Sequence, residues 1–182
     1  MKKIAVFFGE GFEEIEALTV VDICRRAGIE VNMVSVTGQD RVTGAHKISV
    51  GMDMQFDEVD FAALDMLVLP GGRQGTKNLE AHAGLMEQVD RFYQEGKLLG
   101  AICAAPSIFG HRGMLRGRRA CCYPGFEKEL EGAEVMTSRV TVDNSVITSR
   151  GMGTAMDFAL TITAILCGEE VAQKLSQTII YE

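Results

Sequence analysis

Leu98-Leu-Gly-Ala-Ile-Cys-Ala-Ala-Pro-Ser-Ile-Phe-Gly110 is the stretch of sequence that decides the fold of this chain. The apolar run from Leu98 to Ile102 predicts a short buried strand. Cys103 follows this run directly, and Pro106 suits the first turn of a helix, where its missing N–H would have no partner. Small residues on both sides of the cysteine leave room for a sharp turn. The stretch therefore predicts a strand, a tight turn and a helix.

The predicted turn at Cys103 is a relative of the G-x-S-x-G elbow, which holds a nucleophile above a parallel sheet. A thiol in this place would face a helix N-terminus, whose free N–H groups favour the thiolate. We therefore interpret Cys103 as a reactive nucleophile. The alternative is a buried thiol that packs as a small hydrophobic side chain, which is the commoner role of an isolated cysteine.

Length and charge indicate one soluble domain over residues 1–182. The formal net charge of −7 argues against a nucleic-acid partner, which usually requires a basic surface. The longest nearly apolar run, from Phe158 to Cys167, is too short to span a bilayer. Because Met1-Lys2-Lys3 leads into only five apolar residues, no signal peptide is recognised. We expect a cytoplasmic protein without membrane contact.

The five cysteines also favour a reducing compartment. None of them forms a C-x-x-C pair, and the adjacent Cys121 and Cys122 match neither a usual disulfide nor a zinc motif. We therefore expect free thiols and neither a metal nor a cofactor.

The first thirty-six residues predict a βαβ unit. The mostly apolar run from Lys2 to Phe8 predicts a strand buried on both faces. Glu13 to Ala27 predicts a helix with acids in its first turn and Gly28 as its C-terminal cap, and Ile29 to Val36 predicts the second strand.

The remaining pattern extends this unit into a doubly wound, mainly parallel α/β sheet of the flavodoxin-like kind, with strand order 2-1-3-4-5. The polar, glycine-broken segment Thr37 to Phe56 predicts a β-ribbon beside the main sheet. The other expected elements are a strand at Met66–Leu69, a helix over Leu79–Glu95 interrupted near Gly84, a short strand at Arg119–Cys122, a helical piece at Phe126–Leu130, a hairpin over Val140–Thr148, and helices at Thr154–Leu166 and Glu169–Leu175.

Functional groups in such a sheet gather at the carboxyl ends of the strands. Three of these ends are notable here, at Gly9 to Phe12, at Pro70 to Gly75 and at Cys103. Gly71 and Gly72 lack the Cβ that would keep a substrate from their backbone N–H groups. With the amide of Ala104 they would form an oxyanion hole above Cys103. The alternative is a plain glycine turn after a strand.

Glu16 is the candidate partner of Cys103. It shares a helical stripe with Val20, Ile23 and Ala27, so its carboxyl group is expected to point inward, where it can retain a proton and donate it to a thiolate. The alternative is an acid that the helix dipole stabilises at the N-terminus. Helical periodicity does not settle which acid of this helix is buried.

A cysteine–histidine pair is not specified by the sequence. Only His46, His82 and His111 are available, and the last two lie near predicted helix ends. His46 lies in the predicted ribbon, from where it would reach Cys103 only through the tertiary fold.

Four motifs together resemble the DJ/ThiJ/PfpI superfamily, and within it the branch of the Parkinson's-associated protein deglycase and bacterial ThiJ-like proteins. They are Glu13-Glu14-Ile15-Glu16-Ala17, Leu69-Pro70-Gly71-Gly72, Ala101-Ile102-Cys103-Ala104-Ala105-Pro106 and Thr148-Ser149-Arg150-Gly151. The resemblance covers essentially the whole chain. It implies a homodimer, an elbow cysteine at Cys103, a protonated glutamate at Glu16 and oxyanion contacts at Gly72 and Ala104.

Two positions depart from the family pattern. Tyr123 stands before Pro124 where many members carry a histidine, and a phenol is a poor base near neutral pH. Ala104 replaces the histidine that follows the cysteine in the protease branch. The resemblance therefore argues against a peptidase and assigns proton transfer to Glu16, to another group or to water.

The resemblance implies a glutathione-independent glyoxalase or a deglycase. We hypothesise a cofactor-free cysteine enzyme in which Cys103 attacks small reactive aldehydes such as methylglyoxal or their adducts. The alternative is a non-enzymatic sensor of oxidative stress, or a redox chaperone, in which Cys103 is oxidised and Glu16 holds the sulfinate.

Overall fold

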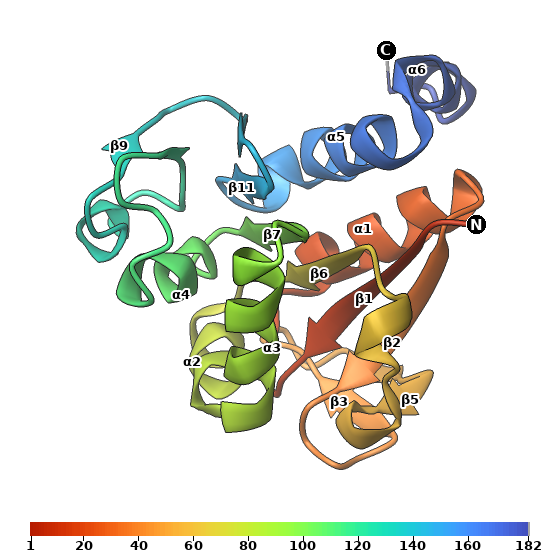
Figure 1. Cartoon of the computed structure of the whole chain (residues 1–182). Helices are drawn as coiled ribbons and strands as arrows, with labels where there is room; N and C mark the ends of the chain where they lie inside the picture. The colour runs from red at the N-terminus through yellow and green to blue at the C-terminus, as the bar shows by residue number, and fades with distance from the viewer. Residues whose placement is uncertain (182) are drawn as a thin grey trace.

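The computed structural model describes residues 1–181, and a mainly parallel sheet lies at its centre with helices on both faces (Figure 1). The strand order is β10-β11-β7-β6-β1-β2-β5, and every neighbouring pair is parallel except β10 and β11. In that order the strands are Val140–Asp143, Val146–Ser149, Leu98–Ile102, Met66–Leu69, Lys3–Phe8, Glu30–Ser35 and Met54–Gln55. The expected doubly wound order is confirmed in β2-β1-β6-β7-β11, to which β5 and β10 add the two edges.

Strand β1 shows why the centre of the sheet needs apolar residues at every position. Ala5 and Phe7 pack into the core on one face, and Ile4, Val6 and Phe8 pack into the core on the other. All five of these side chains have zero exposure. A strand buried on both faces cannot alternate apolar and polar residues, which explains the continuous apolar runs in the sequence.

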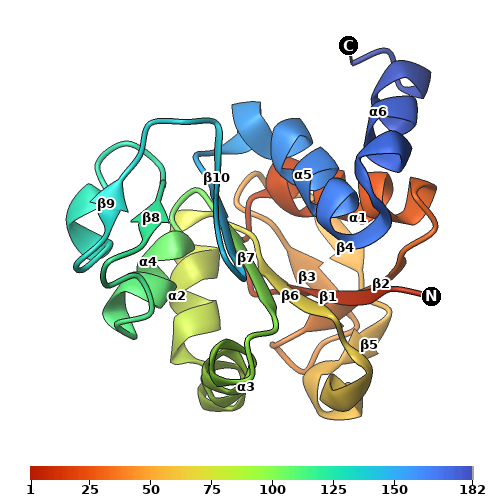
Figure 2. The ribbon, with the colours of Figure 1, turned by 45° about the horizontal axis from the view of Figure 1, so that its top comes forward.

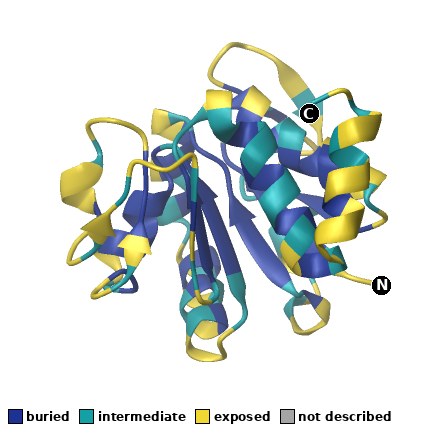
Figure 3. Ribbon diagram, turned by 90° about the horizontal axis from the view of Figure 1, so that it is seen from above, coloured by how far each residue is buried: buried dark blue, intermediate teal, exposed yellow. Residues whose placement is uncertain are grey.

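Helices cover the two faces in separate groups (Figure 2). Helices α1 (Glu14–Arg26) and α5 (Ala155–Cys167) pack against each other on one face, and α6 (Glu169–Thr178) packs on α5. The other face is covered by α3 (Ala83–Gln94) together with α2 (Arg73–Ala81) and α4 (Pro106–His111). The sheet between them is buried along most of its length (Figure 3). No helix within residues 1–181 is long and apolar enough to cross a membrane.

The helix expected over Leu79 to Glu95 is two helices in the structure. Helix α2 begins earlier, at Arg73, and the break falls at His82, which ends α2 and caps α3 by accepting a hydrogen bond from the Leu85 N–H at 3.0 Å. The sequence pattern missed the first turns of α2 because they are mostly polar and exposed.

The expected β-ribbon beside the main sheet is present as the antiparallel pair β3 (Arg41–Thr43) and β4 (Ser49–Gly51). The expected short strand at Arg119 is β8 (Arg119–Ala120), and it pairs with β9 (Glu134–Val135), which the sequence did not indicate. Four 3-10 turns complete the fold at Phe56–Glu58, Phe61–Ala63, Glu127–Glu129 and Met152–Thr154.

Candidate active site

Cys103 lies in the turn between β7 and α4 with a positive φ of 67°. This left-handed conformation is uncommon for a residue other than glycine and costs of order 1 kcal/mol or more, so the surrounding structure has to hold it. Two backbone hydrogen bonds do so. The Cys103 N–H donates to the Ser149 carbonyl at 3.0 Å, and the Cys103 carbonyl accepts from the Tyr123 N–H at 2.8 Å.

Glu16 projects from the first turns of α1 and is only 1% exposed. Its Oε2 accepts a hydrogen bond from the Gly71 N–H at 2.9 Å. Burial, reinforced by the charge of Glu13, raises the pKa of Glu16 to about 7, and the hydrogen bonds with Cys103 and Gly71 oppose the shift. The carboxyl group therefore retains a proton far above the pH at which an exposed glutamate loses it.

Gly71 lets Glu16 and Cys103 meet. A Cβ on Gly71 would lie 2.4 Å from the Glu16 Oε2 and 2.5 Å from the Cys103 Cβ, and both distances are too short for any side chain. The glycine after β6 therefore keeps open the space that the carboxyl and the thiol share. Gly72, with a φ of +89°, allows an equally close approach, because its own Cβ would lie 2.4 Å from the Gly11 carbonyl oxygen.

The ionisation of Cys103 differs from the sequence expectation. Burial and the adjacent Glu16 carboxylate raise the pKa of the Cys103 thiol to about 12, while the backbone N–H groups of Gly72 and Ala104 act in the opposite direction. The helix N-terminus therefore does not by itself give a reactive thiolate. Since Glu16 and Cys103 repel each other when both are charged, the pair shares one proton over a wide pH range.

Tyr123 stands at the mouth of this site. Tyr123 is 50% exposed. A Cβ built on Gly151 would lie 3.2 Å from the Cδ2 atom of the Tyr123 ring and 4.0 Å from the Glu16 Oε1. The tyrosine ring thus lies beside Gly151, at the exposed side of Glu16. Gly151 ends the family motif Thr148-Ser149-Arg150-Gly151, but the motif does not indicate this contact, because the contact joins segments that are distant along the chain.

None of the three histidines is within the hydrogen-bond network of Cys103 among the described residues. His46 Nδ1 lies 2.9 Å from the Glu14 Oε2, and this hydrogen bond raises the pKa of His46. His82 caps α3, and His111 lies between Glu80 and Glu129 at 2.6 and 2.8 Å. The structure therefore brings together Cys103, Glu16, Gly71, Gly72 and Ala104, with Tyr123 at the edge and no cysteine–histidine pair.

The model of the DJ-1/PfpI family matches residues 2–165. The chain belongs to this family. All five cysteines in the structure are free thiols, as the sequence indicated.

Several curated relatives carry the name of this family. Protein DJ-1 homolog B of Arabidopsis thaliana is 36% identical over 96% of this chain, and the Parkinson disease protein 7 homolog of Danio rerio is 33% identical over 98% of this chain and 97% of its own length. A protein named deglycase from Pyrococcus abyssi is 31% identical over 83% of this chain and 91% of its own length. The chain spans only 40% and 46% of the length of DJ-1 homologs B and A of Arabidopsis thaliana.

Solved structures of the family share the whole fold. A cysteine-to-alanine mutant of the DJ-1 superfamily protein STM1931 from Salmonella typhimurium superposes with a TM-score of 0.95, at 35% identity and full coverage of both chains. The oxidized DJ-1 of Toxoplasma gondii gives the same TM-score of 0.95 at 32% identity, over 100% of this chain and 99% of that chain.

Proposed function

We propose that this DJ-1/PfpI protein is a cofactor-free cysteine enzyme that acts on small reactive aldehydes such as methylglyoxal or on their adducts. One observation carries the proposal, namely that Cys103 shares a buried space with Glu16, whose pKa is about 7. The deglycase name of the Pyrococcus abyssi relative supports the same class of substrate. Cys103 is the nucleophile and Glu16 the group that moves protons.

Attack on methylglyoxal begins when one proton of the pair resides on Glu16 and the sulfur is a thiolate. The sulfur forms a bond to the aldehyde carbon, and the C=O π electrons move to oxygen, which takes the Glu16 proton and becomes a hemithioacetal hydroxyl. The backbone N–H groups of Gly72 and Ala104, which already face the sulfur, stabilise the developing oxyanion, and Gly71 widens the approach.

Glu16, now a carboxylate, removes the proton from the same carbon while the ketone oxygen gains a proton from water, which gives an enediol. Glu16 then returns its proton to the former ketone carbon, and the hydroxyl on the first carbon gives its proton to water as a C=O bond forms there. The first carbon is thereby oxidised to a thioester and the second is reduced to an alcohol, so no external oxidant is needed. Water then cleaves the thioester, which releases lactate and restores the thiol. Tyr123 is the further group that could donate a hydrogen bond to substrate, but its phenol is a poor base.

The deciding experiment measures methylglyoxal consumption and lactate formation without glutathione for the wild type and for Cys103→Ser. Cys167→Ser is the matched control, because Cys167 is also half-buried but lies at the end of α5. We expect turnover in the wild type and the control, and at least about a hundredfold loss in Cys103→Ser, as is usual when a nucleophile is removed. Equal inertness of all three proteins would exclude the aldehyde enzyme.

An oxidative-stress sensor is the second candidate. It is favoured because Cys103 lies beside a glutamate that carries a proton near neutral pH and can donate it to a sulfinate oxygen. The oxidized state of the Toxoplasma gondii structure agrees with such chemistry. After treatment with at least two equivalents of peroxide per chain, which the two oxidation steps from thiol to sulfinate require, peptide mass spectrometry should find sulfinate at Cys103 first. Earlier oxidation of Cys121, Cys122 or Cys167 would exclude the sensor.

We also propose that the protein acts in the cytoplasm as a homodimer, without a nucleic-acid or membrane partner. The free cysteines and the net charge of −7 support this setting. Ile15 and Ile48 are 50% and 53% exposed, and both adjoin Glu14, so they offer an apolar surface for a second copy.

A further inference from the structure

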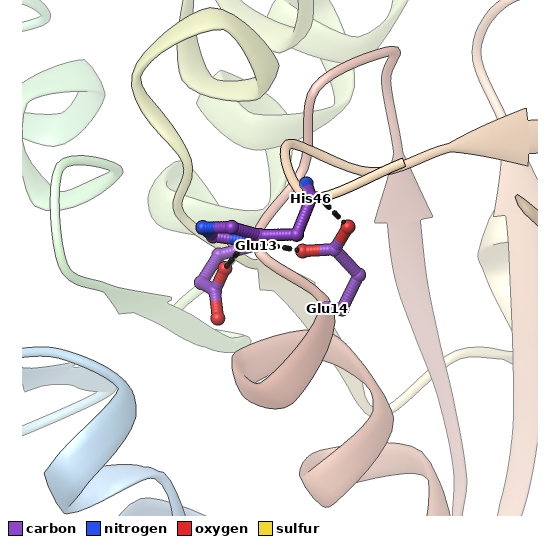
Figure 4. A group of neighbouring side chains, drawn as sticks. All are labelled: Glu13, Glu14 and His46. Atoms are coloured by element: carbon purple, nitrogen blue, oxygen red, sulfur yellow. Dashed lines mark hydrogen bonds and ion pairs between the residues drawn. The ribbon is translucent and has the colours of Figure 1, made fainter. Parts of the chain in front are cut away.

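Glu13, Glu14 and His46 form a cluster at the N-terminus of α1, and the aldehyde mechanism does not use it. The two glutamates begin α1, and His46 comes from the loop between β3 and β4. Figure 4 shows both carboxylates turned toward the His46 side chain. One oxygen of each glutamate and one ring nitrogen of the histidine all lie within 4.8 Å of one another.

The carboxylates are buried, whereas the imidazole is open to solvent. The side chains of Glu13 and Glu14 are 10% and 4% exposed, and that of His46 is 72% exposed. Two negative charges buried side by side are costly unless a cation compensates them. Among residues 1–181, no lysine or arginine forms an ion pair with either glutamate, and His46 is the one basic side chain that does. The cluster therefore has an excess of negative charge and a route of access.

The protein holds the carboxylate of Glu13 only weakly. Its Oε1 accepts a hydrogen bond from the Ile15 N–H at 3.4 Å, but its Oε2 accepts none within the described part of the chain and lies 3.5 Å from the His46 Nδ1. The neighbouring Glu14 is held more firmly, because its Oε1 accepts the His46 N–H at 2.7 Å. The carboxylate of this nine-tenths buried side chain thus makes one long hydrogen bond and one long ion-pair contact, which leaves it able to accept a further partner.

The separations fit a first-row divalent ion. Ligand atoms about 2.0–2.1 Å from zinc in a tetrahedral site lie ~3.3 Å from one another. The His46 Nδ1 lies 2.9 Å from the Glu14 Oε2 and 3.5 Å from the Glu13 Oε2, which brackets that spacing. Two carboxylates and one imidazole suit Zn²⁺ better than Ca²⁺ or Mg²⁺, which take oxygen ligands.

We propose that Glu13, Glu14 and His46 bind one Zn²⁺ ion, with water in the fourth position. The ion would neutralise the two buried carboxylates and tie the β3–β4 ribbon to the N-terminus of α1. Such a site uses other residues than the aldehyde chemistry, although the charge of Glu13 contributes to the raised pKa of Glu16. Zn²⁺ binding and aldehyde turnover are measured separately, so the two proposals can fail separately.

The test is calorimetric titration of Zn²⁺ into the full-length protein carrying Cys103→Ser and Cys167→Ser together, a background that removes both half-buried thiols as competing ligands. We expect one ion per chain. His46→Gln should weaken binding by at least about tenfold, because even outer-shell partners of a metal are worth 10–100-fold. Glu13→Gln should weaken binding similarly, and its side chain anchors no loop, so the variant keeps the fold.

His111→Gln is the matched control. His111 also lies between two glutamates, Glu80 and Glu129, but it contacts them through opposite ring nitrogens and cannot bring them to one ion. This variant should bind Zn²⁺ as the parent does. As a second measurement, bound Co²⁺ should show the visible absorption bands of a four-coordinate site in the parent and in His111→Gln, and these bands should be absent in His46→Gln. Absence of binding in the parent, or unchanged binding in both His46→Gln and Glu13→Gln, would overturn the proposal.

Discussion

At the scale of single residues, the chemistry of the site depends on the direct contact between the Glu16 carboxyl and the Cys103 thiol. The carboxyl and the thiol each have a raised pKa because both are buried. The Glu16 carboxylate also disfavours the Cys103 thiolate, whereas the hydrogen bond with Cys103 opposes the shift of Glu16. Such a pair stores one proton between two acceptors, which is the state that a thiolate nucleophile with an adjacent acid requires.

This ionisation makes stability depend on pH. Between about pH 4.5 and 7 the folded protein keeps the Glu16 proton that the unfolded chain has lost, so the free energy of unfolding falls as the pH rises. Across this pH range the free energy of unfolding falls by about 3 kcal/mol, at 1.36 kcal/mol per pKa unit. Because glutamine does not ionise, Glu16→Gln should show a smaller fall between pH 5 and 8 in urea unfolding, and exposed Glu170→Gln should keep the wild-type fall. Parallel curves for wild type and Glu16→Gln would contradict the assignment.

Gly71→Ala should damage both stability and function. Its Cβ would overlap the Glu16 carboxyl and the Cys103 side chain, and overpacking of this kind costs roughly 1–3 kcal/mol. Gly153→Ala is the control, because a Cβ there meets nothing within 4 Å. The midpoint temperature of thermal unfolding and the rate of methylglyoxal turnover should both fall in Gly71→Ala and stay unchanged in Gly153→Ala. A fully active Gly71→Ala enzyme would show that the two groups need not meet.

At the scale of elements, the fold brings the carboxyl ends of several parallel strands together at the site. The turns after β1 and β6 meet because the Glu13 N–H donates to the Gly71 carbonyl at 2.9 Å. The turn after β7 is joined to the end of β11 because the Cys103 N–H donates to the carbonyl of Ser149, the last residue of that strand. Parallel strands in register bring their carboxyl ends to one edge, which is why residues distant in sequence form the site.

Helix α5 is attached to the sheet through Phe158, whose ring fills the space above Gly100 in β7. A Cβ on Gly100 would lie 3.1 Å from the Phe158 Cζ and 2.5 Å from the Met66 Cε. Phe158→Ala should cost about 3–5 kcal/mol and Gly100→Ala roughly 1–3 kcal/mol. The double variant should lose less than the sum of the two, because the new methyl group enters the cavity. Denaturant unfolding of the four proteins measures this coupling, and strict additivity would contradict it.

At the scale of the whole molecule, the proposed dimer can be tested on its exposed apolar side chains. Ile15→Glu places a charge on the surface beside Glu14 and should convert the dimer to a monomer in analytical ultracentrifugation. Ile180→Glu is the control, because Ile180 is 93% exposed near the far end of the chain. If Ile15→Glu sediments as the wild type does, the dimer uses another surface.

The strand order, the β-ribbon and the tight turn at Cys103 could be predicted from the sequence alone. These follow from local rules, since continuous apolar runs predict buried parallel strands and small residues predict tight turns. The sequence left open which acid of α1 is buried, and the structure buries Glu13, Glu14 and Glu16 together. The sequence also indicated no partner for His46, and we expected no metal ligands.

Only the tertiary structure decided the protonation of the site and the contacts between distant segments. A pKa depends on burial and on charges from other elements, so the helix N-terminus expected to favour the Cys103 thiolate is outweighed by burial and by Glu16. The meeting of His46 with Glu13 and Glu14 spans more than thirty residues of chain and follows no motif spacing. Local sequence patterns therefore predict the helices and strands of this protein. The protonation of its site depends on tertiary packing, because electrostatic energies depend on which side chains the fold brings together.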